Sequence, residues 1–330
     1  MEYKVFIFSN KIINGYTSFD MKKFNQICAY NLIDISGFVI DNFYRERDFI
    51  TFDDNLLIFC DNKDLDDLIL YNLPKISGEK ELINDQIVVY KKNDKKYVFV
   101  PLEVQLDLLN DVFKEDKTYE VLRYRIFGLG RDRIINSLDI LKNEIEGFKY
   151  KIDYKDLLCD IYLTYSSLKE GLLDDNKAKI LNTFNQYIYS ENSLSLEQII
   201  YNYLSESGQT IAINENITKG ELLASFLSEE KNFINVIKNY IIRENIEIDD
   251  QQFIDRSMKF LNSSQSDVAI LTAGKEIDGG LEFKFSLVTK DEVHVYNSTF
   301  KADKTSCVNM AKNSILFHLA KKLRKNDFAF

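Results

Sequence analysis

The sequence predicts a multidomain α/β protein. Short apolar runs of strand length alternate with amphipathic helical patterns along most of the chain, as expected for sheets covered by helices. With 330 residues, 45% of them hydrophobic and 13% aromatic, the chain is long enough to bury cores in two or three domains. Changes in the pattern predict boundaries near residues 115 and 192, and therefore three domains, 1–115, 116–192 and 193–330.

The first domain is expected to be an α/β sheet. The expected strands are Tyr3–Ser9, Ile35–Ile40, Asn55–Cys60 and two runs within Gln86–Val100, and the expected helices are Asp20–Ile33, an acidic helix after Cys60, and Leu102–Phe113. Pro101 is expected to open the last of these helices, because proline fits the first turn of a helix.

The middle segment has the order strand, helix, strand, helix, which is typical of a small α+β module. The expected elements are Tyr119–Phe127, Arg131–Ile145, Leu157–Tyr165 and Asp174–Tyr189. The loop Phe127–Arg131 carries two glycines but lacks the third glycine of a dinucleotide-binding motif. A strand-to-helix turn is therefore favoured over a phosphate-binding loop.

The last third begins a second α/β pattern. Helix Leu196–Ser207 is expected to end at Gly208, because glycine adopts the left-handed backbone that closes a helix. The other expected elements are a strand from Thr210, strands Glu282–Thr289 and Val293–Phe300, and a final helix Ser306–Leu323. Two segments, Thr210–Glu221 and Ser266–Leu281, each look like an apolar strand running into a polar loop that contains glycine. Such loops are where α/β proteins build ligand sites.

Composition disfavours several classes of function. The net charge of −10 argues against nucleic acid as a partner, because binding phosphates needs clustered lysine and arginine. The basic run Lys321–Lys325 is expected to close the last helix, where positive charge favours the helix dipole. The start of the chain does not resemble a secretion signal, and no segment approaches the ~20 apolar residues of a membrane span. A cytoplasmic location without membrane contact is therefore expected.

No metal site and no cofactor are predicted. The four cysteines are widely separated, so they are expected to be small buried hydrophobic side chains. His294 and His318 have no second ligand at a suitable spacing and are expected to pack structurally. Carboxylate-rich groups could attract a divalent cation, although a solvated face is their more common role. These groups are Asp53 with Asp54, and Asp64 with Asp66 and Asp67.

The order of weak motifs across nearly the whole chain resembles the competence/damage-inducible protein A (CinA) family. In the middle segment, Arg125–Asp132 keeps Arg125, Phe127, Gly128 and Gly130 of a family pattern, while the Glu-Ser pair that follows is replaced. The resemblance implies a molybdopterin-binding-like α/β domain, a small α+β middle module, and a C-terminal CinA-type α/β domain associated with nicotinamide mononucleotide deamidation. It also implies self-association as a homodimer or another homo-oligomer.

In the first domain, most residues of the family's turns are replaced. Gly15 and an aliphatic pair are all that remains of the family turn that follows the first strand. The glycine-rich loop expected after a later strand corresponds to Cys60–Leu68, which has no glycine, so a phosphate or pterin could not approach the backbone as closely. Pro101 and Glu103 match a family Pro-x-Glu at the start of a helix.

In the last domain, the resemblance implies that the catalytic positions are replaced. The family turn ESCTGG, whose serine is the amidase nucleophile, corresponds to Glu215–Gly220, and the nucleophile position is Asn216. A carboxamide cannot supply the activated hydroxyl that covalent amide cleavage needs. A family tyrosine is retained as Tyr240, but a lysine expected five residues later falls on Asn245. The expected proton-transfer partner is therefore missing too.

A third family turn, similar to TGIAGPDGG, corresponds to Thr272–Gly280 and keeps Thr272, Asp278 and both final glycines. A late family arginine corresponds to Lys304, which keeps the charge but loses bidentate recognition of anions. The residues predicted to contact a ligand are Asn216, Lys219, Gly220, Tyr240, Asp278, Gly279, Gly280 and Lys304.

These replacements leave two hypotheses. The first is a catalytically degenerate, CinA-like pseudoenzyme that binds a nucleotide or serves as an interaction scaffold. The second is an active nicotinamide mononucleotide amidase or ADP-ribose pyrophosphatase with non-standard residues, for which Thr218, Thr272 and Glu215 are the candidate catalytic residues. Thr218 is a poor substitute for the serine, because two positions along a helix turn a side chain by about 200°. It is expected to form a hydrogen bond near the helix start.

Overall fold

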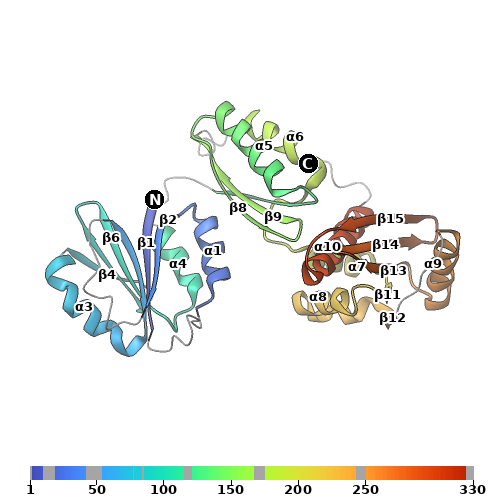
Figure 1. Cartoon of the computed structure of the whole chain (residues 1–330), viewed down its shortest axis with the longest axis horizontal. Coiled ribbons are helices and arrows are strands. Elements are labelled where there is room, and N and C mark those ends of the chain that lie inside the picture. Colours follow the sequence, from blue (N-terminus) through green and yellow to red (C-terminus); the bar gives the residue numbers. More distant parts are fainter. Residues whose placement is uncertain are drawn as a thin grey trace. The chain divides into compact units, whose positions relative to one another are not determined.

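The computed structural model describes residues 2–9, 19–41, 54–76, 78–83, 85–114, 121–166, 175–242 and 250–324. Within these ranges the chain forms three β-sheets with helices packed on them, which confirms the predicted α/β class (Figure 1). The chain divides into two compact units. One contains Met1–Leu122, Glu144–Asp153 and Tyr162–Asp174, and the other contains Arg123–Asn143, Tyr154–Ile161 and Asp175–Phe330. The predicted boundaries near residues 115 and 192 stay a prediction.

Some residues considered above lie outside the described part of the chain. They are Gly15 with its aliphatic pair, Asp53, Asn245 and Lys325.

The first sheet has six strands in the order β2-β1-β3-β6-β5-β4. Its strands are β1 (Glu2–Phe8), β2 (Asp34–Asp41), β3 (Asn55–Cys60), β4 (Glu79–Ile83), β5 (Ile87–Lys92) and β6 (Lys95–Pro101). β2, β1, β3 and β6 are parallel, whereas β5 and β4 pair antiparallel. The carboxyl ends of the parallel strands therefore meet at one edge of the sheet.

Helices cover both faces of this sheet (Figure 1). α1 (Met21–Tyr30) and α4 (Leu109–Lys114) pack into the core on one face, and α3 (Asn62–Ile76) packs into the core on the other. Because β1 and β3 are buried on both faces, their sequences are nearly continuous apolar runs and do not alternate.

Pro101 closes a strand and does not open a helix, contrary to the prediction. It is the last residue of β6 and pairs with Cys60 of β3. A proline is tolerated at the end of a strand, where the ladder no longer needs its missing N–H. The predicted helix starts later, as the 3₁₀ helix η2 (Leu106–Leu108) followed by α4.

The middle segment forms a four-stranded sheet in the order β10-β7-β9-β8. Its elements are β7 (Leu122–Phe127), α5 (Arg131–Glu144), β8 (Lys149–Lys155), β9 (Leu158–Thr164), α6 (Asp175–Phe184), the 3₁₀ helix η4 (Asn185–Tyr187) and β10 (Ile188–Ser190). The sequence did not predict β8, and the predicted helix to Tyr189 ends early. Ile188 and Tyr189 are buried in a strand that pairs with β7, so tertiary packing overrides the local helical pattern.

The glycine-containing loop after β7 is a strand-to-helix turn, as predicted. Gly128 has a φ of 89° and Arg131 begins α5. The preceding Arg125 stabilises the same region, because its Nε donates to Asp160 Oδ1 over 2.8 Å and its Nη1 donates to the Leu194 carbonyl over 2.7 Å. The family-like pattern here therefore serves the packing of the module.

The third sheet has five strands in the order β12-β11-β13-β14-β15. β11 is parallel to β12 and β13, and β13, β14 and β15 are antiparallel. The elements are α7 (Leu196–Ser207), β11 (Ile211–Glu215), α8 (Glu221–Glu229), the 3₁₀ helix η5 (Lys231–Val236), β12 (Ile237–Ile242), α9 (Asp250–Ser264), β13 (Val268–Ile277), β14 (Gly280–Thr289), β15 (Val293–Phe300) and α10 (Lys304–Leu323).

The main core of this domain lies between the third sheet and the helices α7, α8 and α10. α9 covers the opposite face through Phe260 and Leu261. The predicted end of α7 is confirmed, because Gly208 has a φ of 65° and its N–H bonds the last turn. His318 is half-buried beside Tyr296, with 4.1 Å between ring centres, so its predicted packing role is also confirmed.

All four cysteines are free thiols and are buried, as predicted. Burial raises the pKa of the Cys28 thiol to about 12, so this thiol stays protonated at neutral pH. In the described part of the chain, no helix is long and apolar enough to span a membrane.

Candidate functional site

The carboxylate of Glu215 organises the turn between β11 and α8. Glu215 is the last residue of β11 and is fully buried. Its Oε2 accepts hydrogen bonds from Thr218 Oγ1 at 2.6 Å and from the backbone N–H groups of Gly220 and Leu222 at 2.9 and 3.2 Å. Its Oε1 accepts from the backbone N–H of Leu223 at 3.0 Å. One buried carboxylate thus accepts from the N–H groups of Gly220, Leu222 and Leu223 at the start of α8, where N–H groups lack partners within the helix.

Tyr240 on β12 completes this cluster. Its hydroxyl donates to Glu215, and burial together with the neighbouring carboxylate raises the pKa of Tyr240 to about 12. Gly220 lies beside it with a φ of 100°, a backbone conformation that a residue with a Cβ adopts only with strain. The turn therefore needs glycine at this position.

Thr272 on β13 ties the same turn to its neighbouring strand. Its Oγ1 accepts a hydrogen bond from the backbone N–H of Asn216 at 2.7 Å and lies 3.5 Å from the Asn214 carbonyl, to which it donates. Asn216 and Thr272 are both buried. The hydroxyl groups of Thr218 and Thr272 are therefore engaged in hydrogen bonds that hold the turn together.

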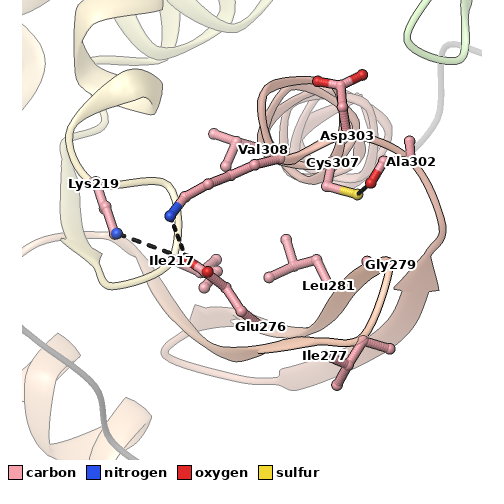
Figure 2. A pocket seen from close by; sticks show the side chains of 12 residues that line it. Ile217, Lys219, Glu276, Ile277, Gly279, Leu281, Ala302, Asp303, Cys307 and Val308 are labelled. Carbon is pink, nitrogen blue, oxygen red and sulfur yellow. Dashed lines mark hydrogen bonds and ion pairs between the residues drawn. The ribbon is translucent and has the colours of Figure 1, made fainter.

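A cavity of about 310 Å³ lies beside this buried cluster. It is bounded by the turn before α8, the hairpin end that joins β13 to β14, and the start of α10 (Figure 2). Its lining residues are Ile217, Lys219, Glu276, Ile277, Gly279, Gly280, Leu281, Ala302, Asp303, Lys304, Cys307 and Val308. The volume lies at the small end of the range for small-molecule sites.

Charged side chains form one side of the cavity. Lys304 Nζ lies 2.7 Å from Glu276 Oε1, and Lys219 Nζ lies 4.0 Å from the same oxygen. Figure 2 shows Lys219 and Glu276 pointing toward each other, with Ile217 and Leu281 beside them. The ion pair with Lys304 lowers the pKa of the Glu276 carboxyl. The cavity therefore combines an apolar lining with two ammonium groups and with the carboxylates of Glu276 and Asp303.

The N-terminus of α10 also reaches the cavity. Asp303 caps this helix, since its Oδ1 accepts from the backbone N–H of Ser306 at 3.0 Å, and this hydrogen bond lowers the pKa of the Asp303 carboxyl. Cys307 lines the cavity one turn further on, and its thiol donates to the Ala302 carbonyl, with 3.4 Å between Sγ and O. Both side chains are thereby engaged in bonds that shape the start of the helix.

The structure places the predicted ligand-binding residues in three different settings. Lys219, Gly279, Gly280 and Lys304 line the cavity. Asn216, Gly220 and Tyr240 belong to the hydrogen-bonded cluster around Glu215 and Thr272, and they are not among the lining residues. Asp278 is exposed at the hairpin end.

The second predicted polar loop is a tight hairpin. β13 continues to Ile277, which pairs with Gly280 at the start of β14, so Asp278 and Gly279 alone connect the two strands. A Cβ on Gly280 would lie 2.1 Å from the Phe300 carbonyl oxygen. Close packing of β14 against β15 thus accounts for this glycine without any ligand.

Sequence reasoning missed Glu276, one of the two acidic residues that line the cavity. Glu276 lies inside a strand and matches no retained motif position, and the pairing of strands brings it to the same side as Lys219 and Lys304. The apolar lining residues Ile217 and Leu281 were missed as well. No local pattern distinguishes them from ordinary core residues, and their role depends on where the hairpin meets the turn.

The first domain has a cavity at the carboxyl edge of its parallel strands. This cavity has a volume of about 440 Å³ and is lined by Asp61, Asn62, Lys63 and Glu103. Asp61 is buried and accepts from Ser9 Oγ at 3.3 Å, and Glu103 Oε2 accepts from the backbone N–H of Asn62 at 3.2 Å. The acidic helix expected after Cys60 is confirmed as α3, and Asp66 and Asp67 are exposed on it.

Among the described residues, no group of three or more histidine, cysteine, aspartate or glutamate side chains is placed to hold a metal ion.

Comparison with known proteins identifies a relative. No family model matches the chain. A stretch of 125 residues is 29% identical to a CinA-like protein of Sulfurihydrogenibium sp. (strain YO3AOP1) and covers 37% of this chain. The chain spans 28% of the length of that protein.

Two solved structures are similar to part of the chain. A competence or damage-inducible protein from Enterobacter asburiae matches 40% of this chain and 99% of its own, with 16% identity and a TM-score of 0.35. The competence/damage inducible protein CihA from Agrobacterium tumefaciens matches 39% of this chain and 96% of its own, with 13% identity and a TM-score of 0.32. The expected resemblance to the CinA family is confirmed over this stretch of 125 residues.

Proposed function

We propose that this divergent relative of CinA-like proteins binds an anionic small molecule of the nucleotide class in the cavity beside α10 and does not cleave an amide there. The observation that carries the proposal is the state of the candidate nucleophiles. Thr218 and Thr272 are buried. Their hydroxyl groups form hydrogen bonds with Glu215 and with the backbone of Asn214 and Asn216.

Activation of a hydroxyl requires a base that can take its proton while the oxygen faces the substrate. The Thr218 hydroxyl does face a carboxylate, but that carboxylate also accepts hydrogen bonds from Gly220, Leu222 and Leu223. Both oxygens of Glu215 are therefore already engaged in hydrogen bonds that hold the turn. Thr218 and Thr272 are also not among the residues that line the cavity.

Binding is supported by the form of the cavity and by the position of its two lysines. Its apolar residues can cover a flat organic group, and the ammonium groups of Lys219 and Lys304 lie on one side of it. Lysine binds phosphate as a point charge, without the paired hydrogen bonds that arginine makes. A ligand that combines an apolar ring with a phosphate matches this arrangement.

The test is a calorimetric titration of the full chain with nicotinamide mononucleotide and, separately, ADP-ribose. We expect binding without release of ammonia, and a loss of affinity of about tenfold in Lys304→Ala, since that ammonium group would make a charge-assisted bond. The matched control is Lys275→Ala, because Lys275 pairs with Glu282 at 3.1 Å and does not line the cavity.

Equal binding by Lys304→Ala and Lys275→Ala would place the ligand elsewhere, and no binding of either compound would remove the proposal. Turnover that Thr272→Ala abolishes and Asn216→Ala spares would instead establish the alternative, an active amidase or pyrophosphatase.

A further inference from the structure

One of the side chains that line the cavity, Glu276, is itself an anion next to both lysines. Glu276 Oε1 lies 2.7 Å from Lys304 Nζ and 4.0 Å from Lys219 Nζ, so one carboxylate faces both ammonium groups. These three side chains come from β13, from α10 and from the turn before α8, and the fold brings them together at the cavity.

Lys219 is presented by an unusual backbone conformation. Its φ is 50°, in the left-handed region that residues with a Cβ seldom adopt. Such conformations persist where the surroundings enforce them, and here Glu215 fixes both sides of Lys219 by bonding Thr218 and Gly220. The direction in which the Cα–Cβ bond of Lys219 leaves the backbone is therefore set by the buried cluster.

The ion pair between Glu276 and the lysines is exposed and exchangeable. The side chains of Lys304 and Glu276 are 65% and 56% exposed, and Lys219 is 63% exposed. An exposed ion pair shifts an equilibrium by no more than about fivefold. A ligand phosphate, with its greater charge and additional acceptor oxygens, can compete with such a pair for both lysines.

We propose that Glu276 is a tethered competitor for the cavity, and that the ligand carries a doubly charged phosphate group which displaces this carboxylate from Lys219 and Lys304. The inference rests on the proposed function and names the ligand group and the residue that opposes its binding. Removing the charge of Glu276 must then strengthen phosphate binding, because the competitor is lost while both lysines remain.

A nearby pair of side chains provides a matched control. Glu282 of β14 lies 3.1 Å from Lys275 of β13, and their side chains are 48% and 55% exposed. Neither residue lines the cavity. Glu282→Gln and Glu276→Gln therefore change the net charge of the protein equally, on the same hairpin, so a general electrostatic effect alters both variants alike.

The experiment is a calorimetric titration of the full chain with inorganic pyrophosphate at low, constant ionic strength. We expect Glu276→Gln to bind pyrophosphate about fivefold more tightly than the unchanged protein, and Glu282→Gln to stay within about twofold of it. Adding Lys304→Ala to Glu276→Gln should abolish the gain. Low salt is needed because exposed charges are screened at higher salt.

The outcomes separate this inference from the proposed function. If Lys304→Ala removes binding but Glu276→Gln and Glu282→Gln behave alike, the cavity binds anions and Glu276 does not compete. Weaker binding by Glu276→Gln would mean that Glu276 positions the lysines, and would also overturn the inference. If pyrophosphate binds to none of the proteins, the inference is wrong, and the titrations with nicotinamide mononucleotide and ADP-ribose decide the proposed function separately.

Discussion

Two glutamates of the C-terminal domain lie in opposite environments. Glu215 is fully buried and accepts hydrogen bonds from backbone N–H groups and from the hydroxyls of Thr218 and Tyr240. Glu276 is more than half exposed and faces two lysine side chains. Water cannot replace the partners of Glu215, whereas it competes constantly for those of Glu276.

The two carboxylates therefore differ in how firmly they are held: Glu215 fixes the backbone of the turn, and Glu276 makes contacts that can exchange. A buried carboxylate whose donors are all supplied by the fold costs much free energy to remove, so Glu215 fixes the turn permanently. An exposed ion pair contributes about 0–1 kcal/mol, so a ligand can replace Glu276 at little cost. The turn that resembles a catalytic loop is therefore held firmly by Glu215, whereas the exposed ion pairs of Glu276 exchange readily with water.

The largest expected effect is that of Glu215→Ala on stability. This change leaves the buried N–H groups that begin α8 without an acceptor, so we expect the free energy of unfolding to fall by about 3 kcal/mol or more. Urea denaturation of the variant and of Glu276→Ala measures the contrast, and Glu276→Ala should change stability by less than about 0.5 kcal/mol. If both variants lost the same free energy of unfolding, Glu215 would not hold its turn more firmly than Glu276 holds the lysines.

A smaller loss is expected for Thr272→Val, which keeps the shape of the side chain and removes the hydroxyl. The backbone N–H of Asn216 then loses its acceptor in a buried position, at a cost of about 1–3 kcal/mol. The control is Thr299→Val, at an exposed position of β15. A Thr272→Val variant as stable as the control would show that the hydroxyl does not hold the turn, and would return Thr272 to the list of candidate nucleophiles.

The smallest effect, and the one that depends on pH, is that of Tyr240→Phe. At pH 7 this variant should lose about 1 kcal/mol, because a partly exposed hydroxyl no longer donates to Glu215. The pKa of Tyr240 is raised from 10.0 to about 12, so its stabilising effect is complete below pH 10 and is lost as the pH rises through 12.

The measurement is the difference in unfolding free energy between the unchanged protein and Tyr240→Phe at pH 8, 10 and 11.5. The difference should shrink between the last two values, whereas Tyr203→Phe, at a half-buried position of α7, should show no such trend. A difference that stays constant to pH 11.5 would contradict the hydrogen bond to Glu215.

Much of the fold follows from local sequence patterns. Helix α7, with Ser195 and Gly208 at its ends, and strand β15, with its alternation, were predicted to the residue or nearly so, because their signals lie within the elements themselves. Strand β10 was not predicted, because its pairing with β7 depends on residues about sixty positions away in the chain.

The candidate site was predictable only in part. The turn after β11 and the lysines at positions 219 and 304 could be found from a pattern of residues, and both lysines reach the cavity. The position of Glu276 opposite both lysines depends on how the β13–β14 hairpin meets α10, which no local pattern encodes. The engagement of Thr218 and Thr272 likewise became visible only through the hydrogen bonds of the folded chain.

The central claim is that this site has no hydroxyl able to attack an amide. The most direct test is to incubate the full chain with excess nicotinamide mononucleotide, measure released ammonia, and determine the intact protein mass after rapid acid quenching. The account predicts ammonia release no faster than without protein, and an unchanged protein mass. Ammonia release above that background, together with an acyl adduct on Thr218 or Thr272, would contradict it.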